Sequence, residues 1–141
     1  MTAMLTVGGF FGGSFEKPKI TSMEKGRILD MSFNFALDII ELYKVMIESH
    51  EYVISKQLLR SSASVGANVE EANAGISKRE FAVKMGIASK EARESRYWLR
   101  LLNKSQLVKG DYSKKLSDVE HMINVLTKIV KTSQQSLSKH T

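Results

Sequence analysis

The chain has 141 residues, 43% of them hydrophobic and 26% charged, and its formal net charge is +6. This length and composition are typical of one globular domain with a hydrophobic core of its own. The absence of cysteine excludes disulfide bonds and thiolate metal sites and fits a reducing cytoplasm. No apolar run approaches the roughly 20 residues of a membrane span, and the apolar first residues lack the basic segment of a signal peptide. We therefore expect a cytoplasmic protein that has no membrane partner.

Residues 1–22 are predicted to form a flexible N-terminal extension, because Gly-Gly-Phe-Phe-Gly-Gly has turn chemistry without periodicity. The first helix is predicted over residues 23–49, where Met31, Phe35, Leu42 and Met46 follow steps of four and seven residues.

A second helix is predicted over residues 51–73, and its buried side is rich in small residues. Two heptad-spaced sets define this side: Leu58, Val65 and Ala72, and Ile54, Ser61 and Asn68. A polar Asn on such a seam indicates register control or function. Gly75 is suited to a left-handed end of this helix, and Ser77 and Glu80 have the spacing of a capping box for the next one.

The third helix is predicted over residues 78–104 and carries two apolar lines. The core line is Phe81, Met85, Ala88, Ala92, Ser95, Leu99 and Leu102, and the second line is Val83, Ile87, Trp98 and Leu101. One bundle core can use only part of this surface, so we expect a homo-oligomer with Ile87, Trp98 and Leu101 near the subunit contact.

The fourth helix is predicted over residues 113–133, with a main apolar stripe from Leu116 to Val130. Four amphipathic helices with short connections indicate an all-α, antiparallel up-down-up-down four-helix bundle. We assign residues 23–134 to this bundle and residues 135–141 to a frayed C-terminal tail.

The positive charge is concentrated around the third helix, because residues 77–110 hold nine Lys or Arg and three Asp or Glu. At about 100° per residue, seven of the cations of this helix and one tyrosine fall within an arc of roughly 120°. They are Lys78, Arg79, Lys90, Arg93, Arg96, Tyr97, Arg100 and Lys104. The stripe predicts RNA or DNA binding through Lys90, Arg93, Arg96, Tyr97, Arg100 and Lys104. An acidic protein partner and a purely solvated face are the alternatives.

We expect no catalysis, cofactor or metal. The glycine pairs near the N-terminus lack the Lys and Ser or Thr of a phosphate-binding loop. Asp118 and His121 form a single, weak match to a bundle metal motif. Glu70 and Glu71 point about 100° apart on a helix and form no acid–base dyad. The polar residues Arg60, Asn68, Glu71 and Glu94 are instead predicted to form one structural network within the bundle.

Several motifs resemble a known bacterial family of four-helix-bundle proteins, named for members encoded in intervening sequences of 23S ribosomal RNA genes. The motifs are Leu58-Leu59-Arg60-Ser61, Ser64 to Glu71, Ser77-Lys78-x-x-Phe81, Ile87-Ala88 and Glu94-x-x-Tyr97-Trp98-Leu99. The resemblance covers about residues 28–130, and Ala72 departs from it where many members have Gly. It implies an antiparallel bundle that assembles into a homo-oligomer, in the form of a ring-like pentamer. A similar accessory protein of diversity-generating retroelements binds nucleic acid and a reverse transcriptase.

Overall fold

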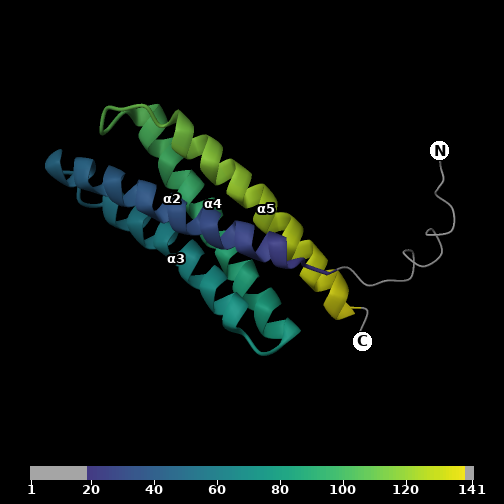
Figure 1. The fold of residues 1–141 in the computed structure, drawn as a ribbon. Helices are drawn as coiled ribbons and strands as arrows, with labels where there is room; N and C mark the ends of the chain where they lie inside the picture. The colour runs from purple at the N-terminus through teal and green to yellow at the C-terminus, as the bar shows by residue number, and fades with distance from the viewer. Residues whose placement is uncertain (1–18, 139–141) are drawn as a thin grey trace, which may run out of the picture.

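The computed structural model describes residues 19–138, which form four helices and no strand (Figure 1). The helices are α2 (Ser22–Glu48), α3 (Ile54–Ala74), α4 (Lys78–Ser105) and α5 (Ser113–Ser138). Each helix contacts the helices on either side of it in the order α2–α3–α4–α5, and α5 closes the ring against α2. The predicted all-α antiparallel four-helix bundle is therefore confirmed. None of the four helices in this described region is long and apolar enough to cross a membrane.

The first helix begins with a reciprocal cap. Thr21 Oγ1 accepts a hydrogen bond of 3.1 Å from the backbone N–H of Glu24, and the Glu24 carboxylate accepts one of 3.2 Å from the Thr21 N–H. Ile20, just before this cap, packs against the core. The bundle therefore starts earlier than the predicted boundary at residue 23. The predicted extension otherwise falls on residues 1–18, which lie outside the described part.

The connection between α2 and α3 is built from two different caps. His50 has a left-handed φ of 63°, and the N–H groups of His50 and Glu51 bond back to the carbonyls of Ile47 and Met46. These bonds form a Schellman motif without glycine. The Glu51 carboxylate then accepts the first free N–H groups of α3, as described below. Residues 51–53 are used in this connection, so α3 begins three residues later than predicted.

Gly75 does not have the predicted left-handed conformation, because its φ is −66° and its ψ is 146°. A lack of room for a side chain, and not a left-handed φ, explains why this position is a glycine. A Cβ atom on Gly75 would lie 2.7 Å from Oε1 of Glu80 and 3.2 Å from the carbonyl oxygen of Ala72. Ser77 does cap α4 as predicted, by accepting the N–H of Glu80 at 3.0 Å. The Glu80 carboxylate accepts the N–H of Ile76.

The last helix is longer than predicted. The structure continues α5 to Ser138, so residues 135–138 are helical rather than part of a frayed tail. Ser133 and Ser136 are buried in this last stretch, which shows that it packs against the bundle. Residues 139–141 of the predicted tail lie outside the described region.

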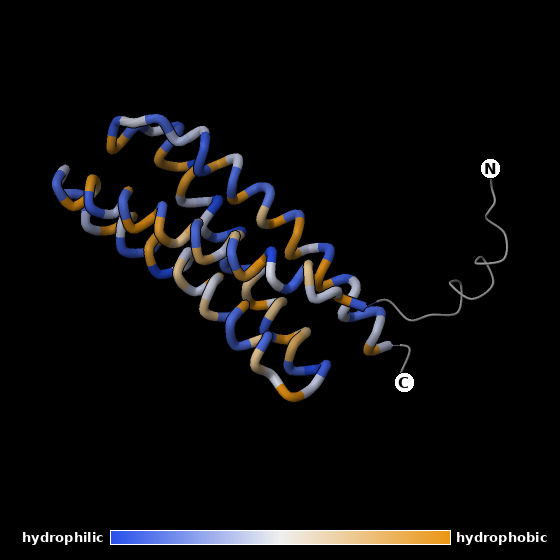
Figure 2. Tube along the Cα trace, viewed as in Figure 1, coloured by the Kyte–Doolittle hydropathy of each residue, from blue (hydrophilic) through white to orange (hydrophobic). Residues whose placement is uncertain are grey.

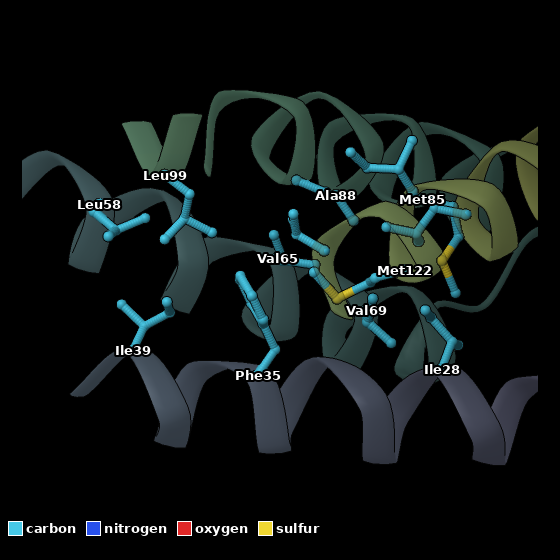
Figure 3. Close-up of a cluster of buried hydrophobic side chains, with 14 of the residues drawn as sticks. Ile28, Phe35, Ile39, Leu58, Val65, Val69, Met85, Ala88, Leu99 and Met122 are labelled. Carbon is cyan, nitrogen blue, oxygen red and sulfur yellow. The ribbon is translucent and has the colours of Figure 1, made fainter. Parts of the chain in front are cut away.

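The core is continuous along the bundle. Hydrophobic and hydrophilic residues alternate along each helix (Figure 2). Side chains from all four helices meet in the centre, including Phe35 of α2, Val65 of α3, Leu99 of α4 and Met122 of α5 (Figure 3). The predicted seam residues Leu58, Val65 and Ala72 of α3 are at most 1% exposed.

Small residues bring α3 and α4 into close contact. Ser61 of α3 and Ser95 of α4 are fully buried, and their hydroxyl oxygens lie 2.8 Å apart. Each hydroxyl also has a carbonyl of its own helix within reach, Leu58 for Ser61 and Glu91 for Ser95. The buried polar pair is therefore satisfied and fixes the register of the two helices.

Candidate nucleic-acid interface

The cations of α4 lie on the side of the helix opposite its core residues. Ala88, Ala92, Leu99 and Leu102 are fully buried. Lys90, Arg93, Arg100 and Lys104 are exposed and Arg96 is half-buried. Because the apolar face of this amphipathic helix is buried in the core, the cations on its other face point toward solvent.

Two of the predicted arginines are held by α5. Arg93 donates to Thr127 Oγ1 at 3.0 Å and to Ser89 Oγ at 2.5 Å. Arg96 forms an ion pair with Glu120 at 3.0 Å. These contacts orient both guanidinium groups across the α4–α5 groove. They also reduce the charge available from Arg96, because Glu120 neutralises it locally.

The other three predicted cations have no such partner. Lys90, Arg100 and Lys104 form no hydrogen bond or ion pair among the residues that the structure describes. Lys90 and Lys104 are 14 residues apart, which corresponds to about 21 Å along the helix. A row of uncompensated cations of this length is available to an extended anion.

Tyr97 supplies the aromatic part of the predicted site. Its side chain is 54% exposed, and its ring lies edge-on to Trp98, with centroids 5.2 Å apart and an interplanar angle of 70°. The contact restrains the ring, which remains more than half exposed. An exposed and restrained ring of this kind can stack on an unpaired base.

The sequence reasoning missed a cation on α5. Thr127 contacts Arg93, which shows that this side of α5 faces the basic stripe. Lys131 follows one helical turn later, is exposed and has no hydrogen bond or ion pair within residues 19–138. Its place beside the stripe depends on how α5 packs against α4, so no local sequence pattern indicated it. We define the α4–α5 basic face as Lys90, Arg93, Arg96, Arg100, Lys104 and Lys131.

Part of the predicted polar network is present between α3 and α4. Arg60 forms ion pairs with Glu94 and with Glu91, the latter at 3.3 Å. Trp98 Nε1 donates to the Glu94 carboxylate at 3.0 Å. The hydrogen bond from Trp98 lowers the pKa of Glu94 below its usual value, and Arg60 adds to this effect against the opposing effect of burial. The pKa of Arg60 is raised by its hydrogen bond to Glu94.

The other two predicted members of this network lie elsewhere, so the single four-residue network is wrong. Glu71 pairs with Lys84 at 2.7 Å. Asn68 donates to the carbonyl oxygen and hydroxyl of Ser64 on its own helix. Eight residues separate Asn68 from Arg60, which places them about 12 Å apart along α3, too far for one shared cluster.

The predicted subunit contact forms an apolar strip on α4 beside this cluster. Ile87 is 38% exposed and Leu101 is 37% exposed, whereas Trp98 is half-buried against the core. Val83 is 56% exposed and stands on the same side of the helix. The strip lies toward α3 and the α4–α5 basic face lies toward α5, so a single helix presents both surfaces.

The described residues contain no cluster of three or more potential metal ligands. His121, which the sequence paired with Asp118, lies instead with its Nε2 2.9 Å from a guanidinium nitrogen of Arg27. Lys114 holds the Asp118 carboxylate at 2.7 Å and also pairs with Asp38 of α2 at 3.3 Å. These side chains therefore join α2 and α5 through polar contacts.

Comparison with known proteins places this bundle in a family. The model of the 23S rRNA-intervening sequence protein family matches residues 24–131. A solved structure from Bacteroides thetaiotaomicron VPI-5482, of a protein with unknown function from the S23 ribosomal protein family, is 38% identical with a TM-score of 0.72. The match covers 77% of this chain and 98% of that one. No curated protein matches the sequence. The chain belongs to the 23S rRNA-intervening sequence protein family.

Proposed function

We propose that this protein is a non-enzymatic, homo-oligomeric bundle that binds RNA or DNA through the α4–α5 basic face. The observation that carries the proposal is the row formed by Lys90, Arg100 and Lys104. These cations are exposed, lack protein partners among the described residues and stand on one rigid helix beside Tyr97. Such a row can follow a phosphate backbone and release counterions from it.

The face favours weak sequence selectivity. Cations contact phosphates, which carry no sequence information, and base discrimination needs side chains directed at base edges. Within α4, Asn103 near the end of the row is the only amide side chain. Repetition of the face on every subunit of an oligomer, a pentamer by family resemblance, would combine several weak contacts by avidity.

An acidic protein is the second candidate partner, favoured by the apolar strip beside the cations. Val83, Ile87 and Leu101 together offer apolar area next to positive charge. A protein partner would use both surfaces, whereas a nucleic acid would depend mainly on the charge. The salt dependence of binding therefore distinguishes the two partners.

The test measures fluorescence anisotropy of labelled single-stranded RNA, single-stranded DNA and duplex at about 50 and 200 mM salt. The variant Lys90→Gln, Arg100→Gln, Lys104→Gln removes the unpaired row without disturbing the contacts of Arg93 and Arg96. We expect at least a tenfold loss of affinity and a salt slope reduced by roughly 2 to 3 units for three lost phosphate contacts.

A charge-matched control keeps the face intact. The control variant Lys44→Gln, Lys56→Gln, Lys128→Gln removes three positive charges from α2, α3 and α5. It should retain most of the affinity, apart from the general effect of net charge. Equal loss in both variants, or no loss in the first, would contradict the assignment of the site.

A further inference from the structure

A cavity of about 390 Å³ lies at the end of the bundle where the chain enters α2. The start of α2, the α3–α4 connection and the end of α5 meet at this same end (Figure 1). All three contribute to its walls. Its size falls in the range of small-molecule sites, and it lies apart from the unpaired row of cations on α4.

Part of the cavity wall is apolar. Ile20, Ala72, Ile76 and Phe81 line it. Ala72 and Phe81 pack with the core, so this wall is rigid and continuous with the interior of the bundle. Such a wall accepts the apolar or aromatic body of a ligand.

The cavity lining also carries positive charge. Lys19, Lys25 and Lys78 line the cavity, and no carboxylate does. Lys25 Nζ stands 5.2 Å from the centroid of the Phe81 ring, and Lys19 has no hydrogen bond or ion pair in the described structure. The carboxylate of Glu80 accepts the N–H of Ile76 and lies beside Gly75 of the cavity lining, so one negative charge stands against the three lysine charges. The cavity therefore has a local excess of positive charge.

The N-terminal end of α4 adds to this field. Ser77 and Lys78 line the cavity, and α4 begins at Lys78. The N-terminus of a helix carries a partial positive charge, which favours an anion nearby.

A buried hydroxyl in the same cavity has no hydrogen-bond partner within residues 19–138. Ser136 is 9% exposed, lines the cavity and forms no hydrogen bond among the described residues. Ser133, one turn earlier, donates its own proton to the carbonyl of Ile129 at 2.8 Å. Ser136 thus keeps a free O–H donor at a depth where polar groups are normally paired.

We propose that this cavity binds a small phosphorylated ligand with an apolar or aromatic body, of the size of a nucleoside monophosphate. The phosphate accepts from the lysines and from the hydroxyl of Ser136, and the body of the ligand packs on Phe81 and Ile20. Lysine binds phosphate as a point charge, which suits the arrangement of several Lys without Arg. The proposal does not depend on binding at the α4–α5 basic face.

The test titrates the full chain by calorimetry with the four ribonucleoside monophosphates, with the matching nucleosides and with inorganic phosphate. We expect at least one monophosphate to bind at least tenfold more tightly than its nucleoside and than inorganic phosphate. Binding of the nucleoside equal to that of its monophosphate, or no binding of any probe at millimolar concentration, would overturn the proposal.

Two variants locate the site, and both leave the basic face unchanged. Lys25→Gln and Ser136→Ala should each lower the affinity for the monophosphate at least fivefold. Lys128→Gln, a matched exposed lysine of α5, should not. Ser136→Ala should also leave the melting temperature of the free protein unchanged, since this hydroxyl bonds to none of the described residues. Unaltered binding in both cavity variants would overturn the assignment.

The phosphate could be that of a free metabolite or of a nucleic-acid end. A short oligonucleotide with a 5′-phosphate should compete with the monophosphate if nucleic-acid ends are the source, and the same oligonucleotide with a 5′-hydroxyl should not. Competition by neither oligonucleotide would assign the cavity to the free small molecule. The triple variant of α4 separates this site from the basic face, because it should keep its affinity for the monophosphate.

Discussion

Trp98 holds the carboxylate of Glu94, four residues earlier on the same helix, through an indole N–H hydrogen bond of 3.0 Å. The same carboxylate receives Arg60 from α3. Trp98 therefore orients an acid on α4 toward a cation on the neighbouring helix. The cluster joins the two helices beside the buried pair of Ser61 and Ser95.

The first prediction concerns this cluster. Glu94→Gln keeps an acceptor for Trp98 but removes the charge that attracts Arg60. The side chains of Arg60 and Glu94 are 47% and 35% exposed, so solvent screens the pair, and we expect a loss of about 0.5–1 kcal/mol in urea unfolding. Leu99 and the rest of the core are unaffected. A loss above about 3 kcal/mol would contradict the screened pair, since that is the cost of breaking a buried one.

The same carboxylate makes stability depend on pH. Its folded pKa is below the ordinary value, so the unfolded chain binds the proton more readily. The contribution of Glu94 is complete above the ordinary pKa of about 4.3 and is lost as pH falls through the lower folded value. The native chain and Glu94→Gln should therefore converge in stability as pH falls through this lower folded pKa. A constant difference down to the acid transition would be the contrary result.

The positions of the helices could be predicted because apolar residues recur at helical spacing along each of them. This spacing identifies the face of the helix that is buried. The register between helices could not. Arg60 faces Glu94 and Glu71 faces Lys84 because α3 and α4 run antiparallel, with Ser61 opposite Ser95. The sequence contains all these residues but does not say which turn of α3 meets which turn of α4. The predicted network therefore combined residues from different levels of the bundle.

The candidate site was predicted in part for the same reason. Periodicity within α4 placed its cations on one outward face without any knowledge of neighbours. The partners of Arg93 and Arg96, and the added cation Lys131, come from α5. Those contacts depend on the packing of two helices and on no local pattern.

The second prediction concerns the cap of α3. The Glu51 carboxylate accepts the N–H groups of Val53, Ile54 and Ser55 at 3.0, 2.9 and 2.6 Å. Burial acts to raise the pKa of Glu51, but these backbone donors outweigh it and lower the pKa. Glu51→Gln should cost about 1 kcal/mol in urea unfolding, because it removes the charge from a helix N-terminus.

Glu48→Gln is the matched control for this cap, because Glu48 is an exposed acid at the end of α2. It should change stability by less than about 0.5 kcal/mol. Sequence reasoning missed the role of Glu51, since it stands two residues before the formal N-cap, Val53, and is not a usual capping type. Equal effects of the two substitutions on the free energy of unfolding would contradict the assignment of Glu51 as a cap.

The third prediction is a stabilising change. His50 has a φ of 63°, a region that costs a non-glycine residue about 1 kcal/mol. His50→Gly should raise the free energy of unfolding by about 0.5–1 kcal/mol, because the Schellman bonds of this connection use only the backbone. His50→Ala provides the control, since it also removes the contact between the ring Nδ1 and the Tyr52 hydroxyl but keeps the Cβ atom. Stabilisation by both variants would point to the ring rather than to the backbone.

The last prediction concerns assembly through the apolar strip of α4. Val83 and Leu101 are 18 residues apart, which is five full turns, so they share one direction with Ile87 between them. All three are more than a third exposed, although each could bury its apolar surface in a contact with another subunit. We expect light scattering after size exclusion to give a homo-oligomer for the native chain. Ile87→Glu with Leu101→Glu should give a monomer of unchanged helix content, because two buried charges would oppose the contact.

Phe33→Glu with Leu37→Glu is the control for the strip, since these α2 residues are 64% and 48% exposed. A native monomer at micromolar concentration, or dissociation by the α2 variant alone, would move the contact away from α4.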